Sequence, residues 1–74
     1  MKKKMDVIIL KTNINSKREF ATVKKALRYI YDIKECTVDL EDIDKVLRVI
    51  GINIDETEIA AKVSSLGFKC EELL

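Results

Sequence analysis

Residues Lys11–Phe20, KTNINSKREF, lie where a short apolar run stops and an amphipathic helical pattern begins. Ser16, followed three residues later by Glu19 and then by the apolar Phe20, forms a capping box. The Ser16 hydroxyl is expected to accept from the N–H of residue 19, and the Glu19 carboxylate from the N–H of residue 16. The stretch therefore predicts a helix that begins at Lys17. By itself it predicts no chemistry.

Apolar patterns on both sides of this stretch predict further elements. Val7–Leu10 is a short bulky run typical of a buried central strand. From Lys17 to about Tyr31 apolar residues recur at helical spacing. Alternation from Cys36 to Glu41 predicts a second strand with one buried face, followed by a turn at residues 42–44.

The third predicted strand runs from Lys45 to Ile50, with Leu47 and Val49 facing inward. Val46 and Ile50 then lie on the other face. If helices cover only one side of the sheet, these two residues form part of an exposed apolar patch, which is a possible surface for self-association.

The last third of the chain predicts a second helix and a final strand. Gly51 is expected in a turn, and Asp55 followed by Glu58 resembles a second N-terminal cap. Gly67 is expected just after the end of this helix, and residues 68–71 alternate like a strand.

The resulting order, βαββαβ, predicts one domain over residues 1–74, with residues 1–5 as a flexible basic N-terminus. Right-handed crossovers favour a ferredoxin-like α+β sandwich: a four-stranded antiparallel sheet, two helices on one face, and strands one and three in the centre.

Composition excludes several classes of function. The chain has no histidine, only two glycines and no paired carboxylates in an evident cleft, so we expect no enzyme. The third strand lacks stacking aromatics and net charge is only +1, so we expect no nucleic-acid binding. The longest early apolar run has four residues, too short for membrane insertion or an export signal, and a cytoplasmic location is expected.

Charge is divided unevenly along the chain. Residues 1–30 contain nine basic and two acidic side chains, whereas residues 31–74 contain five and eleven. This division predicts a basic and an acidic face, unless both are ordinary solvated surfaces. The basic patch expected to bind a partner lies in the first helix: Lys17, Arg18, Lys24 and Lys25.

From Leu10 to Leu73 the sequence resembles a heavy-metal-associated domain, the ferredoxin-like fold of copper chaperones and of the N-terminal modules of metal-transporting ATPases. The resemblance is carried by the order and spacing of five segments: Leu10–Asn15, Val23–Leu27, Val38–Leu40, Val49–Gly51 and Gly67–Phe68. Phe68 stands where this family often places an aromatic residue under its metal loop.

The functional motif of that family is M-x-C-x-x-C, whose thiolates bind a soft ion such as Cu(I). Aligned on the first helix, Ile14 falls on the methionine, Ser16 on the first cysteine and Glu19 on the second. Both ligands are therefore absent, and no metal or other cofactor is expected. The loop of Asn13, Ile14, Asn15, Ser16 and Glu19 is predicted to be vestigial.

The two cysteines are not expected to replace the missing ligands. Cys36 and Cys70 are predicted on opposite edge strands, about 14 Å apart at about 4.8 Å per strand, too far for a disulfide or a shared ion. Both are expected to be small buried hydrophobes.

The resemblance and the missing thiolates lead to one main hypothesis, a metal-free protein-interaction or regulatory module that docks onto an acidic partner or a related metal-transport domain. Two alternatives stay open. The oxygens of Asn13, Asn15, Ser16 and Glu19 would hold a hard cation weakly in a metal-binding accessory protein. Alternatively, the helix N-terminus with Lys17 and Arg18 would accept an anionic regulator.

Overall fold

The computed structural model describes residues 4–72 of the chain and gives the predicted order of elements. The six elements are β1 (Met5–Thr12), α1 (Lys17–Ile30), β2 (Asp32–Val38), β3 (Leu47–Ile52), α2 (Glu56–Ser65) and β4 (Cys70–Glu72).

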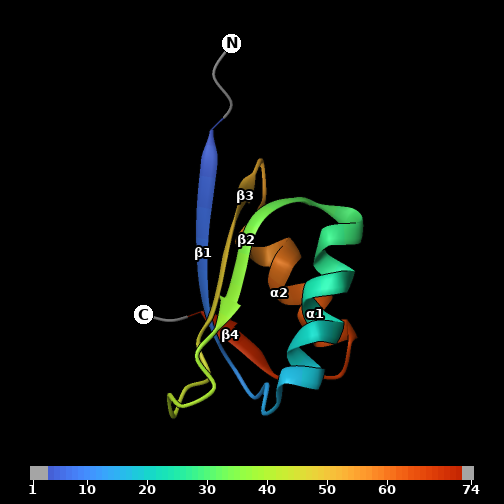
Figure 1. The fold of residues 1–74 in the computed structure, drawn as a ribbon. Coiled ribbons are helices and arrows are strands. Elements are labelled where there is room, and N and C mark those ends of the chain that lie inside the picture. Colours follow the sequence, from blue (N-terminus) through green and yellow to red (C-terminus); the bar gives the residue numbers. More distant parts are fainter. Residues whose placement is uncertain (1–3, 73–74) are drawn as a thin grey trace.

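The strands form one antiparallel sheet in the order β2-β3-β1-β4, with β3 and β1 central. Both helices cover the same side of this sheet and leave its other side open (Figure 1). The ferredoxin-like α+β sandwich predicted from the sequence is therefore confirmed. No helix within residues 4–72 has the length and apolar character needed to cross a membrane.

The core lies between the sheet and the helices. Its buried apolar side chains come from every element except β4, together with one residue from each of two loops: Ile8, Leu10, Ile14, Val23, Leu27, Cys36, Leu47, Val49, Ile54, Ile59 and Val63. No polar or charged side chain of the described residues is buried among them. Hydrophobic burial is thus the main force that holds the helices on the sheet.

The second strand differs from its prediction at both ends. It starts at Asp32, four residues earlier than expected, and stops at Val38. Leu40 and Glu41 lie in the following turn, because the Asp39 N–H donates to the Val46 carbonyl and its carboxylate accepts from the Glu41 N–H. This Asx turn competes with continuation of the strand. Leu40 still packs against the core.

The third strand was predicted two residues too early. Lys45 has a φ of 44°, which is incompatible with a strand, whereas Leu47 and Val49 face the core as expected. Gly51 belongs to β3 and not to a turn. A Cβ at Gly51 would lie 2.6 Å from the Asp32 carbonyl oxygen, so this glycine serves close strand packing.

The ends of the helices follow the predicted capping signals. α1 ends at Ile30, and the N–H of its C-cap Tyr31 donates to the Leu27 carbonyl. Asp55 caps α2 by accepting from the Glu58 N–H at 3.2 Å. Gly67, with a φ of 98°, directly follows Leu66, the C-cap of α2, as predicted.

The two terminal strands also differ in length from their predictions. β1 extends from Met5 to Thr12 because it pairs with β3 along most of its length and with β4 at its end. Met5 is thus not part of a flexible N-terminus, and residues 1–3 lie outside the described residues. Phe68 precedes β4 rather than starting it, and its ring is half-buried against the core.

The edge strand β2 carries an irregularity near its start. Its register with β3 shifts between Ile33 and Glu35, which leaves Lys34 without a register partner at a β-bulge. Lys34 pairs with the Asp32 carboxylate at 3.1 Å. The exposed edge of the sheet is therefore bent and charged at this end.

Candidate functional site

The start of α1 is held by two hydrogen bonds between side chain and backbone. Ser16 is extended (φ −152°, ψ 161°) and its hydroxyl accepts from the Glu19 N–H at 3.1 Å, as predicted. The Glu19 carboxylate accepts from the Asn15 N–H at 2.7 Å, and not from the N–H of Ser16 as expected. In the standard capping box this carboxylate accepts from the N-cap residue, whereas here it accepts from the residue before the N-cap. The bond therefore ties the loop to the first turn of the helix.

The rest of the loop is tied to neighbouring strands and turns. Thr12 Oγ1 donates to the Lys45 carbonyl at 2.7 Å and accepts from the Ile14 N–H at 3.2 Å. Asn13 Oδ1 accepts from the Lys69 N–H at 2.8 Å. Ile14 is fully buried, so the residue aligned with the family's methionine is a core anchor.

These contacts limit the oxygen atoms that the loop can offer to a cation. Asn13, Ser16 and Glu19 each already use a side-chain oxygen to accept a backbone N–H. A cation at this loop would have to compete with those bonds and would find one carboxylate, whereas Ca²⁺ needs six to eight oxygen ligands. Among residues 4–72 no group of three or more His, Cys, Asp or Glu side chains is arranged to hold a metal.

The basic side chains of α1 lie together on its outer surface. Lys17, Arg18, Lys24 and Lys25 fall within about 120° of the helix circumference at about 100° per residue. Arg28 falls inside the same arc and extends it toward the end of the helix. We call these five residues the basic stripe. The only carboxylate of α1, Glu19, lies outside this arc.

The basic stripe points away from the core. Val23 and Leu27 are buried on the other side of the helix, whereas Lys17, Arg18 and Lys25 are exposed. The Lys24 ammonium lies 5.8 Å from the centre of the Phe20 ring, a cation–π distance. The three ion pairs among residues 4–72 involve Lys11 and Lys34, so no cation of the stripe is paired with a carboxylate in this part of the chain.

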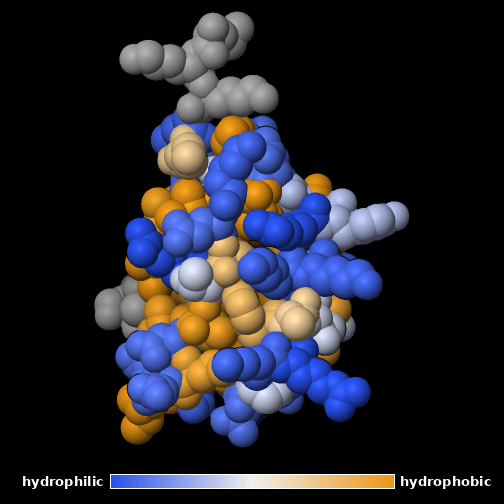
Figure 2. All heavy atoms as spheres, in the orientation of Figure 1, coloured by the Kyte–Doolittle hydropathy of each residue, from blue (hydrophilic) through white to orange (hydrophobic). Residues whose placement is uncertain are grey.

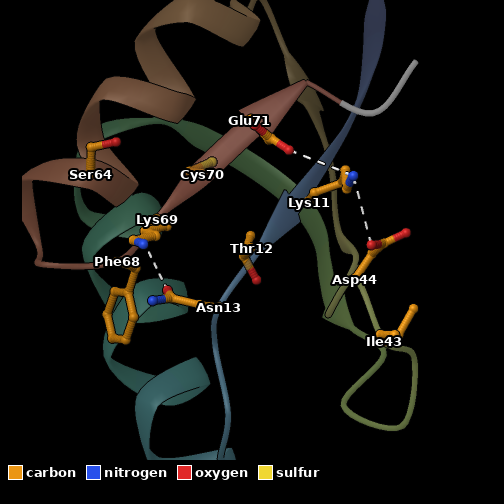
Figure 3. A pocket seen from close by; sticks show the side chains of 10 residues that line it. All are labelled: Lys11, Thr12, Asn13, Ile43, Asp44, Ser64, Phe68, Lys69, Cys70 and Glu71. Carbon is orange, nitrogen blue, oxygen red and sulfur yellow. Dashed lines mark hydrogen bonds and ion pairs between the residues drawn. The ribbon is translucent and has the colours of Figure 1, made fainter.

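A groove of about 590 Å³ lies beside the base of the loop. Figure 3 shows Lys11, Thr12 and Asn13 running between β4 on one side and the turn that carries Ile43 and Asp44 on the other. The Lys11 ammonium bridges this gap, 3.7 Å from the Asp44 carboxylate and 3.6 Å from the Glu71 carboxylate. The groove is therefore spanned by an internal ion-pair network.

The two thiols occupy opposite edges of the sheet, as predicted, and both are free. Cys36 is buried, and burial raises its pKa to about 11, against a smaller lowering by Lys24 and Arg28. Cys70 is only half-buried, contrary to expectation. Its partial burial and the Glu56 carboxylate raise its pKa to about 11. Neither thiol is poised as a nucleophile or a ligand at neutral pH.

Acidic side chains from distant parts of the sequence meet at the start of α2. Partial burial, then the neighbouring Glu72 carboxylate and Asp55, raise the pKa of Glu56. Glu72 belongs to β4 and Asp55 caps α2, so no local pattern in the sequence connects them. Arg28 was left out of the basic patch predicted from the sequence, although its helical spacing from Lys17, Lys24 and Lys25 would have placed it there.

Comparisons with known proteins do not assign this chain to a group: no protein-family model and no curated protein matches it.

Proposed function

We propose that this domain is a non-enzymatic, metal-free interaction module that uses the scaffold of heavy-metal-associated domains and docks through the basic stripe onto an acidic protein. The observation that carries the proposal is the clustering of five cations on one exposed face of α1, none paired with a carboxylate among the described residues. An acidic face on a related metal-transport domain has the matching chemistry. Two free thiols suit a reducing, cytoplasmic location.

The loop supports this role by fixing the helix and not by binding an ion. Ser16 and Glu19 tie the first turn of α1 to the loop, and buried Ile14 ties the loop to the core. The stripe is therefore presented on a rigid helix, which lowers the entropy lost on docking. The alternative of a hard-cation site is weaker, because the same oxygens already accept backbone N–H groups.

The proposal is tested by titrating the ¹⁵N-labelled protein with a synthetic glutamate-rich peptide as an acidic probe. We expect amide shifts concentrated in residues 17–28 and an affinity that falls as salt is added. Lys17→Gln/Lys25→Gln should weaken binding about tenfold, since each exposed charge pair contributes about 0.2–1 kcal/mol.

The matched control is Lys34→Gln/Lys69→Gln, which removes the same charge from exposed sites outside α1. We expect it to bind within about twofold of the wild type. If both double variants weaken binding equally, only net charge matters and the docking role of the stripe is wrong. Shifts centred on residues 12–16 upon addition of Cu(I) under reducing conditions would instead support a metal site.

A further inference from the structure

The open side of the sheet, opposite the helices, carries a continuous apolar surface. It consists of outward-facing residues of the two central strands, Met5, Val7 and Ile9 of β1 and Ile50 and Ile52 of β3. We call these five residues the open-face patch. Val46, which was predicted to share this surface with Ile50, precedes β3 and is half-buried. Met5 is 56% exposed, Val7 55% and Ile9 39%.

The patch is contiguous because its residues are register partners. Val7 pairs with Ile50 and Met5 with Ile52, so their side chains lie side by side across the β1–β3 boundary. In Figure 2 hydrophobic residues reach the surface on the sheet side, on the left, while hydrophilic residues dominate the helix side, on the right. An antiparallel sheet with one solvated face ordinarily presents polar residues there.

The charged residues beside the patch indicate how a second molecule would be oriented on it. On the β2 side, Asp32 is the register partner of Ile52, and Glu35 is the register partner of Ile50. Both acids therefore lie beside the part of the patch that β3 contributes. Arg48 lies one outward-facing position further along β3, beside Thr37. Asp32 is already paired with Lys34 at 3.1 Å, so within residues 4–72 the same face holds the unpaired acid Glu35 toward one end and the cation Arg48 nearer the other.

We propose that the open-face patch joins two copies of this chain face to face, about a two-fold axis that runs across the strands. Such an axis reverses the order of residues along each strand of the second copy. It therefore brings each Arg48 over the partner's Ile50, next to the partner's Glu35, and Val7 toward the partner's Ile9, so that the Arg48–Glu35 pair occurs twice. An axis parallel to the strands would instead set Arg48 over Ile9, so the charge pattern favours the first arrangement.

The size of the surface suits a weak, reversible dimer. The four strands contain eight, seven, six and three residues, which at about 3.3 Å per residue and about 4.8 Å between strands give a footprint of about 380 Å². Two such faces bury roughly 800–1,000 Å², in the range of weak and transient interfaces, and we expect a dissociation constant of about 100 μM. The inference does not depend on the basic stripe, which lies on the other side of the domain.

Sedimentation equilibrium from about 5 μM to about 1 mM protein tests the dimer by mass action. We expect Val7→Thr/Ile9→Thr, which keeps β-branched residues in β1, to raise the dissociation constant at least tenfold. Ile43→Thr is the control. Ile43 is 94% exposed but lies in the turn before β3, away from the patch, so its loss should leave the constant unchanged within about twofold.

A charge swap tests the orientation. Arg48→Glu should weaken the dimer, and Arg48→Glu with Glu35→Arg should restore it, a rescue that a merely structural role would not produce. Circular dichroism and thermal melts show that each variant is folded. A monomer at 1 mM overturns the proposal. So does a dimer insensitive to Val7→Thr/Ile9→Thr, or one that weakens only on loss of Lys17 and Lys25, which would indicate head-to-tail association through α1.

Discussion

The capping box at the start of α1 provides a quantitative test of how the loop is built. Ser16→Ala removes the acceptor of the Glu19 N–H, a change that costs about 1 kcal/mol at a helix N-cap. Glu19→Ala removes the acceptor of the Asn15 N–H and a favourable charge at the positive end of the helix, also about 1 kcal/mol. We expect the double variant to lose about 2 kcal/mol.

That loss is large for a domain of this size. A chain of 74 residues is expected to be stable by about 4–11 kcal/mol, so the double variant gives up a sizeable part of its folding free energy. The melting temperature should fall by about 4–8 °C for each kcal/mol. Urea unfolding followed by circular dichroism measures the loss of free energy, and thermal melts measure the shift in melting temperature. An unchanged m-value shows that the same surface is exposed on unfolding.

Two further variants separate the contributions. Glu19→Gln keeps an acceptor but removes the charge, so it should lose only about 0.3–1 kcal/mol. Lys25→Ala changes an exposed position in the middle of the same helix and should stay within about 0.5 kcal/mol of the wild type. If Ser16→Ala and Glu19→Ala each leave the free energy of unfolding unchanged, the two residues do not secure the helix and the structural explanation of the loop is refuted.

Three other perturbations have defined outcomes. Gly51→Ala should destabilise the fold by about 1–3 kcal/mol in urea unfolding, because the new Cβ would press on the Asp32 carbonyl; no loss would mean that the strands separate easily. Burial raises the pKa of Cys36 to about 11, so the unfolded chain releases this thiol proton first and stability should fall between about pH 9 and pH 11. Between these pH values the urea midpoint of Cys36→Ala should fall less than that of the wild type. An equal fall in both proteins would show that Cys36 does not cause the loss of stability. Glu72→Gln should lower the raised pKa of Glu56, which carboxyl ¹³C shifts would follow; an unaltered titration would exclude Glu72 as a cause.

The element order and the central strands were predictable because short-range signals were consistent along the chain. Ser16 and Asp55 marked the helix starts, and Gly67 marked the end of α2. Leu47 and Val49 gave the inward face of β3 from alternation alone. These signals depend on neighbours within a few residues, which a sequence displays directly.

Strand boundaries were harder because they depend on contacts between distant segments. Gly51 resembles a turn residue in the sequence, yet it lies in β3 where the Asp32 carbonyl comes close. The early start of β2 follows from its pairing with β3, and its end at Val38 follows from the Asp39 turn. Met5, Val7 and Ile9 could not be identified as an exposed surface until β1 was placed in the sheet with its outward side uncovered.

The β-bulge at the start of β2 limits how molecules of this protein can associate. A straight seven-residue edge strand would offer free N–H and C=O groups to a strand of another molecule, and repeated addition would extend the sheet without limit. The register shift beside Lys34 bends that edge and crowds it with charge, while β4 on the far edge has only three residues. Lateral growth into fibres is thereby discouraged at both edges. The contact that we propose between copies lies instead on the open side of the sheet, where a two-fold arrangement is complete with two molecules.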